Sequence, residues 1–107
     1  MMIYKILTGD QWRAFDESGV FEGAPIDLAD GYVHTSTAEQ AQETLDKHFA
    51  GQTGLMLAAL NEADYGDDLK WEVSRGDALF PHIFRPLKLS DVKWCRPITD
   101  GQLPDLT

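Results

Sequence analysis

Two short stretches of the chain gather residues whose side chains can take part in chemistry. The first, DGYVHTST at residues 30–37, contains a tyrosine, a histidine and three hydroxyl side chains, and the second, WEVSRGDALFPHIF at residues 71–84, contains a glutamate, an arginine and another histidine. A carboxylate can accept the proton of a sugar hydroxyl or stabilise a developing oxocarbenium ion, and an arginine can bind a phosphate. These residue types suit a ligand that contains a sugar and a phosphate.

The first stretch lies where an expected strand (GYVH) is followed by an expected helix. Such a junction places free backbone N–H groups and the positive end of a helix dipole beside the end of the strand, which favours an anion. The candidate ligand-binding residues here are Tyr32, His34, Thr35 and Ser36. Turn and cap preferences alone also explain most of this stretch, and a structural histidine is an equally weighted alternative for His34.

The second stretch is predicted to form two neighbouring strands joined by a turn at Arg75-Gly76-Asp77. If these strands form a hairpin, Glu72, Arg75 and His82 converge on adjacent strands. The alternative is a surface Glu–Arg ion pair with no function, which is worth well under about 1 kcal/mol.

Helix signals occupy the first half of the chain. Thr8 and Gln11 have the spacing of a capping box and predict a helix over residues 9–18. A second helix begins after Ser36 or Thr37 and ends before Gly51, whereas residues 20–29 are expected to be irregular.

Strand signals dominate the rest of the chain, at residues 3–7, 54–60, 69–74, 78–84 and 91–98, with Pro81 expected at an edge or bulge. We therefore expect an α+β fold: a compact single domain with two early helices packed on a mixed or mainly antiparallel sheet. The domain is expected to span residues 1–97, followed by a loosely held tail at 98–107. The side chains expected in the core are Trp12, Phe15, Leu45, Phe49, Leu55, Leu57, Trp71, Val73 and Ile83.

Length and charge limit the classes of function. The 107 residues contain no apolar run near the ~20 residues of a membrane helix, and the N-terminus has no signal-peptide pattern. The single cysteine, Cys95, is expected to be an inert thiol and fits a cytoplasmic protein. A net charge of −9 argues against extended nucleic acid as a partner. Basic residues concentrate after residue 69, and the expected phosphate anchors are Arg75, Arg85, Lys88 and Arg96.

The strings IYKI, DLADGYVHTSTAEQAQET, LKWEVSRG and LFPHIFRPL, from about Met2 to Val92, resemble the bacterial domain of unknown function 952 family. This resemblance implies an ADP-ribosyltransferase-like fold with a cleft for NAD, which would be a substrate. It also implies that Lys5 occupies the place of an opening-strand His or Arg, a departure from the pattern. YVHTST would shape the nicotinamide pocket, and Glu72 would bind the ribose 2′-hydroxyl.

The resemblance, together with these residues, implies two alternative functions. The first is ribosyl transfer, with Glu72 and His34 as catalytic residues and the other candidates binding the ligand. The second is a non-catalytic module that binds a nucleotide or small molecule through a degenerate site. Capture of a metal by His34, His82 and Glu72 is a weaker third alternative, because their spacing is not a zinc signature, and no metal is expected.

Overall fold

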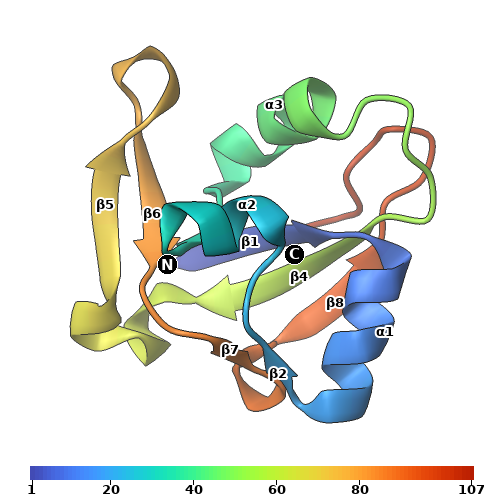
Figure 1. The fold of residues 1–107 in the computed structure, drawn as a ribbon. Coiled ribbons are helices and arrows are strands. Elements are labelled where there is room, and N and C mark those ends of the chain that lie inside the picture. The colour runs from blue at the N-terminus through green and yellow to red at the C-terminus, as the bar shows by residue number, and fades with distance from the viewer.

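The computed structural model describes residues 1–74 and 76–107, and its fold is shown in Figure 1. The α-helices are α1 (Gly9–Ser18), α2 (Pro25–Asp30) and α3 (Ala38–His48). The strands are β1 (Met2–Leu7), β2 (Val20–Phe21), β3 (Val33–His34), β4 (Met56–Asn61), β5 (Leu69–Val73), β6 (Leu79–Ile83), β7 (Leu87–Lys88) and β8 (Trp94–Pro97). Short 3-10 turns occur at Glu62–Asp64, Gly66–Asp68 and Leu89–Asp91. No described helix has the length and apolar content needed to cross a membrane.

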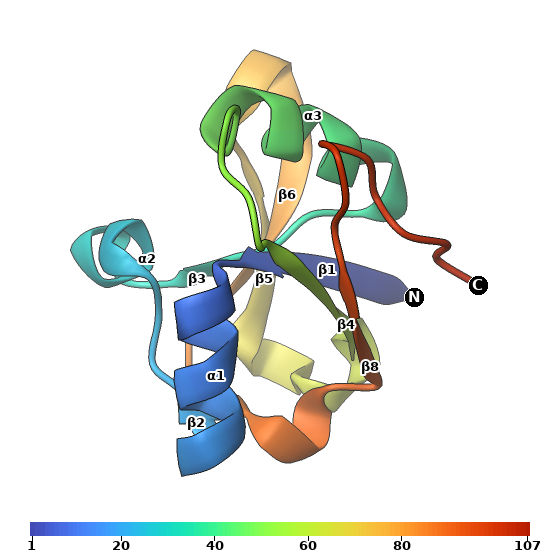
Figure 2. The same ribbon diagram turned by 90° about the vertical axis from the view of Figure 1, so that its right-hand side faces the viewer.

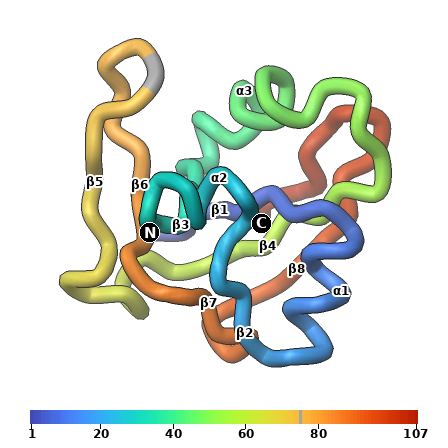
Figure 3. Tube along the Cα trace, in the orientation of Figure 1, coloured from blue at the N-terminus to red at the C-terminus, as the bar shows by residue number. Residues whose placement is uncertain are grey.

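The strands form two three-stranded sheets, ordered β1-β4-β8 and β3-β6-β5, and a small β2-β7 ribbon. Every strand pair is antiparallel. Backbone hydrogen bonds between Tyr4 and Ser36, 2.8 and 2.9 Å long, connect β1 to the segment that follows β3. The α+β fold expected from the sequence is confirmed, and the path of the chain through both sheets can be followed in Figure 3.

The two long helices begin where their capping residues predict. Thr8 and Gln11 form the capping box of α1, and Thr37 and Gln40 form that of α3. Of the two caps considered for α3, the structure therefore selects Thr37.

The expectation of irregular structure over residues 20–29 was wrong, because this segment contains β2 and the third α-helix, α2. Pro25 occupies the first helical position, where its missing N–H costs nothing. The carboxylate of Asp27 accepts the N–H of Ala24 at 2.8 Å, and Gly31 ends the helix with φ of 86°. A helix of only 6 residues is too short to show an apolar period.

The β1-β4-β8 sheet is covered on both faces, which explains the continuous apolar run in β4. Figure 2 shows α1 and α3 on opposite sides of this sheet. On the α1 side, Phe15 packs with Ile3, Leu7 and Phe21, and on the α3 side, Leu45 packs with Leu57 and other apolar residues. Both sides of the core are therefore built from side chains of the helices and strands themselves.

Two expectations about the β5-β6 hairpin were wrong. Val73 was expected in the core, but its side chain is 63% exposed. Pro81 was expected at an edge or bulge, but it lies in the central strand β6. The central strand tolerates Pro81 because β3 ends at His34, so that the missing N–H falls beyond the β3-β6 pairs.

The C-terminal segment forms several contacts with the body of the protein. Thr99 and Gln102 bond to each other across Asp100-Gly101, whose positive φ angles of 55° and 71° are typical of a tight hairpin turn. The side chain of Gln42 on α3 donates to the carbonyl of Gly101 at 2.9 Å. How firmly these contacts hold the tail stays a prediction.

Candidate functional site

One face of the β3-β6-β5 sheet carries most of the candidate residues. The strand register aligns His34 of β3 with His82 of β6, and His82 with Lys70 of β5. Because side chains alternate along a strand, Glu72 lies on the same face as Lys70. We call this surface the polar face and define it by His34, Lys70, Glu72 and His82, together with the flanking rings of Tyr32 and Phe84.

Glu72 and His82 form a hydrogen-bonded pair at the centre of the polar face. His82 Nδ1 lies 2.8 Å from Glu72 Oε1. The His82 side chain is only 3% exposed, whereas that of Glu72 is 43% exposed. Tyr32 stacks on the His82 ring with their centroids 4.1 Å apart. A buried imidazole thus fixes the position of an accessible carboxylate, and the expected convergence of Glu72 and His82 is confirmed.

His34 lies beside this pair and contacts two carboxylates. Its Nδ1 is 2.6 Å from Asp27 Oδ1, and its Nε2 is 3.0 Å from Asp30 Oδ2. The His34 and His82 rings have centroids 5.5 Å apart. His34 and Glu72 therefore lie on the same face of the β3-β6-β5 sheet, each beside the His82 ring.

Asp27 is a buried anchor for this arrangement. Its carboxylate accepts from Lys5 Nζ at 2.9 Å, from the His34 backbone N–H at 3.0 Å and from the Ala24 N–H. Burial alone would raise the pKa of Asp27, but the His34 hydrogen bond and the Lys5 charge outweigh it and lower the pKa to about 2. Burial also lowers the pKa of Lys5, which the adjacent Asp27 charge opposes. Asp27 thus connects β1, α2 and β3 beneath the polar face.

The pKa of Asp27 predicts a loss of stability in acid. Since the folded pKa of about 2 lies below the ordinary 3.8, the stabilisation is fully present above about pH 4 and is lost as the pH falls through about 2. It amounts to about 2 kcal/mol. Urea unfolding at intervals from about pH 5 to pH 2 should give a steeper decline for the natural protein than for Asp27→Asn. Equal declines in the two proteins would contradict the assignment.

Tyr32 and Phe84 also line a cavity of about 200 Å³ next to the polar face. Asp27, Gly31, Val33, Ile83 and Arg85 contribute to its walls. Burial and the charges of Asp30, Glu72 and Asp27 raise the pKa of Tyr32, so its phenol stays protonated at neutral pH. The cavity can hold one ring but is too small for a whole dinucleotide.

Three of the residues expected to bind ligand have internal partners instead. Lys5 is buried against Asp27, and the hydroxyl of Thr35 donates to the carbonyl of Pro81 at 2.6 Å. The Ser36 hydroxyl lies 3.1 Å from Thr44 Oγ1, and its side chain is buried. In this structure these three side chains hold elements together beneath the polar face.

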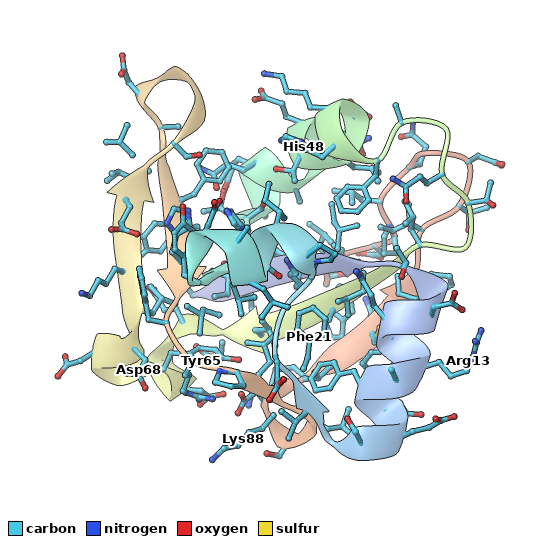
Figure 4. The ribbon with its side chains drawn as sticks, viewed as in Figure 1. Arg13, Phe21, His48, Tyr65, Asp68 and Lys88 are labelled. Carbon is cyan, nitrogen blue, oxygen red and sulfur yellow. The ribbon has the colours of Figure 1, made fainter. Side chains whose placement is uncertain are left out.

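The expected phosphate anchors do not gather at one place. Arg85 contacts Asp68 and Asp91 and covers the Tyr65 ring, although it also borders the small cavity. Arg96 packs on Trp94 and donates to carbonyls of the C-terminal tail. Lys88 belongs to β7, at the opposite end of the molecule from His48 on α3 (Figure 4). Arg75 lies outside the described residues.

The structure also bears on two other kinds of chemistry, a reactive thiol at Cys95 and a metal site. Burial, and to a lesser degree the charge of Asp16, raise the pKa of Cys95 to about 11, so the thiol stays protonated at neutral pH. Within the residues the structure describes, no group of three or more His, Cys, Asp and Glu side chains is placed to hold a metal ion.

Sequence reasoning missed Asp27, Asp30, Lys70 and Phe84 as parts of the site. Asp27 lies in the segment that was expected to be irregular, yet an aspartate two residues after a helix-starting proline is a recognisable N-terminal signal. Lys70 could have been found from the strict alternation of LKWEVS, because it must share a face with Glu72. Phe84 reaches the site because the chain continues past β6 beside Tyr32.

Comparison with known proteins places the chain among uncharacterised relatives. Residues 6–95 match the family described as protein of unknown function DUF952. The crystal structure of protein CC0527 from Caulobacter crescentus has a TM-score of 0.89 and 48% identity, covering 95% of this chain and 92% of that one. Its solution NMR structure has a TM-score of 0.82 and 50% identity, covering 94% and 89% respectively. No curated protein gives a significant match.

Proposed function

The chain belongs to the protein family of unknown function DUF952, and we propose that it binds a nucleotide such as NAD on the polar face. The observation that carries this proposal is the accessible carboxylate of Glu72, fixed by His82 beneath the ring of Tyr32. A carboxylate held in this way is a ready acceptor for the hydroxyls of a ribose. The adjacent aromatic rings offer a surface for a planar base.

The carboxylates around Tyr32 favour a positively charged ring as the ligand. Burial raises the pKa of the Tyr32 phenol, and the charges of Asp30, Glu72 and Asp27 raise it further, so three carboxylates lie near this ring. The oxidised nicotinamide ring of NAD carries a positive charge and would be attracted there. Lys70, whose Nζ lies 5.1 Å from the Phe84 ring centroid, supplies a cation on the same face for a phosphate.

The contacts of three expected ligand-binding residues depart from the pattern that the resemblance implies, as a degenerate site would. Lys5, Thr35 and Ser36, which the resemblance places around the ligand, already have internal partners. Their side chains would have to break those contacts before they could touch a substrate. We therefore give the non-catalytic module as the main proposal.

The Asp27–His34 contact favours ribosyl transfer as a second candidate. A buried carboxylate that bonds Nδ1 fixes the orientation of the imidazole, as in proton-transferring pairs. In such a reaction the bond between the ribose C1 and the nicotinamide nitrogen would break, and Glu72 would stabilise the cationic ribose. Water or another acceptor would then add to C1.

Calorimetric titration with NAD, with free nicotinamide measured in the same samples, tests both candidates. Binding heat without nicotinamide supports the module, and nicotinamide release supports transfer. We expect Glu72→Gln to weaken binding about tenfold or more, because a charge-assisted hydrogen bond is lost. Glu17→Gln on α1 removes the same charge far from the polar face and should bind as the natural protein does. Absence of any binding, or equal affinity in Glu72→Gln, would overturn the proposal.

A further inference from the structure

The β5 strand is the outer strand of its sheet, and its second edge pairs with no other described strand. Figure 1 shows β5 at the margin of the molecule, with β6 on its inner side. An unpaired edge exposes backbone N–H and C=O groups that another strand can bind. Natural edges are often blunted by a proline, a bulge, a very short strand or charged side chains. β5 has 5 residues, LKWEV, without a proline, and it carries one basic and one acidic side chain.

The residues whose backbone groups point outward can be identified from Pro81. Its carbonyl accepts from Thr35, so the backbone C=O of Pro81 points to the β3 side of β6. Trp71 pairs with Pro81, and its own N–H and C=O therefore point away from β6. By alternation, those of Leu69 and Val73 point outward as well. The N–H of Leu69 already donates to the carbonyl of Gly66, so the C=O of Leu69 is the group left for a partner strand.

The sequence of β5 complements itself when two copies run antiparallel. With Trp71 opposite the partner's Trp71, Lys70 faces the partner's Glu72, and Glu72 faces the partner's Lys70. The same register sets Leu69 opposite the partner's Val73. Opposite charges and apolar pairs at facing positions stabilise an antiparallel ladder.

We propose that two copies of this chain associate through β5, forming a continuous sheet of six strands, β3-β6-β5 from each. Trp71 exchanges both of its backbone hydrogen bonds with the partner's Trp71. The N–H of each Val73 donates to the C=O of Leu69 in the other copy. This pairing covers Val73, whose side chain is 63% exposed in the single chain.

The association brings the two polar faces together on one side of the joined sheet. The ammonium of the partner's Lys70 lies beside Glu72, within the surface proposed to bind a nucleotide. Lys70 and Glu72 form the pairs whose backbones do not bond to each other across the interface, where facing side chains come closest. The interface itself needs no ligand, so it can be tested separately from nucleotide binding.

The occupant that best fits this edge is a second copy rather than an unrelated extended peptide. A peptide would satisfy the same backbone groups, but only the chain itself is certain to supply an acid opposite Lys70 and a base opposite Glu72. Because one strand pair gives a small interface, we expect the association to depend on protein concentration.

Sedimentation velocity over a range of protein concentrations, without ligand, tests the proposal. The mass should rise from 12.0 kDa toward about twice that value as the concentration increases. Lys70→Glu alone and Glu72→Lys alone each place like charges opposite each other and should raise the dissociation constant about tenfold. An equimolar mixture of the two variants should recover association, since every facing pair then joins an acid to a base.

Lys47→Glu is the matched control, because it makes the same charge change on α3 and should leave the association unchanged. Circular dichroism of each variant checks that it remains folded. A mass of one chain at every concentration up to about 1 mM would overturn the proposal. So would association that both single variants retain, or a mixture of folded variants that stays as dissociated as its components.

Discussion

Replacing Asp27 with asparagine is expected to lower the free energy of unfolding by about 3–5 kcal/mol. Asp27 and Lys5 are both buried, and their side chains meet at 2.9 Å. Asparagine keeps the shape of the side chain but removes the negative charge, which leaves the Lys5 ammonium buried without its counter-charge. It also weakens the hydrogen bond to His34 Nδ1. Urea denaturation monitored by circular dichroism measures the effect.

Asp30→Asn is the matched control for Asp27→Asn. Asp30 also contacts His34, through Nε2 at 3.0 Å, but its side chain is 44% exposed. An exposed ion pair contributes little, so we expect a change within about 1 kcal/mol. Equal losses for the two variants would show that Asp27 is not the structural anchor described above.

The second large effect is expected from Phe15→Ala, which should cost about 3–5 kcal/mol. Phe15 is 1% exposed, and its ring centroid lies 5.7 Å from those of both Trp12 and Phe21. Alanine would leave a cavity between α1 and the β1-β4-β8 sheet, in the middle of the α1-side core. The same urea denaturation series provides the measurement.

Phe84→Ala supplies the comparison for Phe15→Ala. Phe84 is 39% exposed on the rim of the polar face, so its truncation should cost no more than about 1.5 kcal/mol. If Phe15→Ala proved no more destabilising than Phe84→Ala, the assignment of the core around α1 would be wrong.

Local signals predicted the main elements of this fold well. The helix over residues 9–18 and the Thr37 cap follow from side chains that bond backbone groups three residues away, and such contacts depend on the local sequence alone. Val73 was misplaced because alternation identifies the two faces of a strand without saying how far the core extends. Side chains alternate between the two faces along the whole of β5, but the end of the strand that carries Val73 extends beyond the core.

The candidate site was predictable where its contacts are local in the sequence, and not where they join distant segments. Glu72 and His82 were found because they belong to consecutive strands of one hairpin, where pairing is local. Asp27 and Lys5 meet across 22 residues of chain, through a fold that no short pattern reveals. The internal contacts of Thr35 and Ser36 depend on β6 and α3 in the same way.

A surface cleft elsewhere on the protein is larger than the cavity beside the polar face and offers a second place where a small ligand could bind. A cleft of about 560 Å³ lies between the C-terminal end of α3 and the Ile98–Gly101 turn. Leu45, Phe49 and Leu55 form part of its lining, and none of the polar-face residues borders it. The two sites are therefore separable by mapping where a ligand binds.

NMR chemical-shift mapping of the isotope-labelled protein during titration with NAD tests the central claim most directly. We predict that the largest backbone amide shifts occur at residues 32–34, 70–72 and 82–84, and that Glu72→Gln reduces them at equal NAD concentration. Shifts confined to residues 45–55 and 98–101, around the larger cleft, would contradict the claim. A spectrum left unchanged by millimolar NAD would contradict it equally.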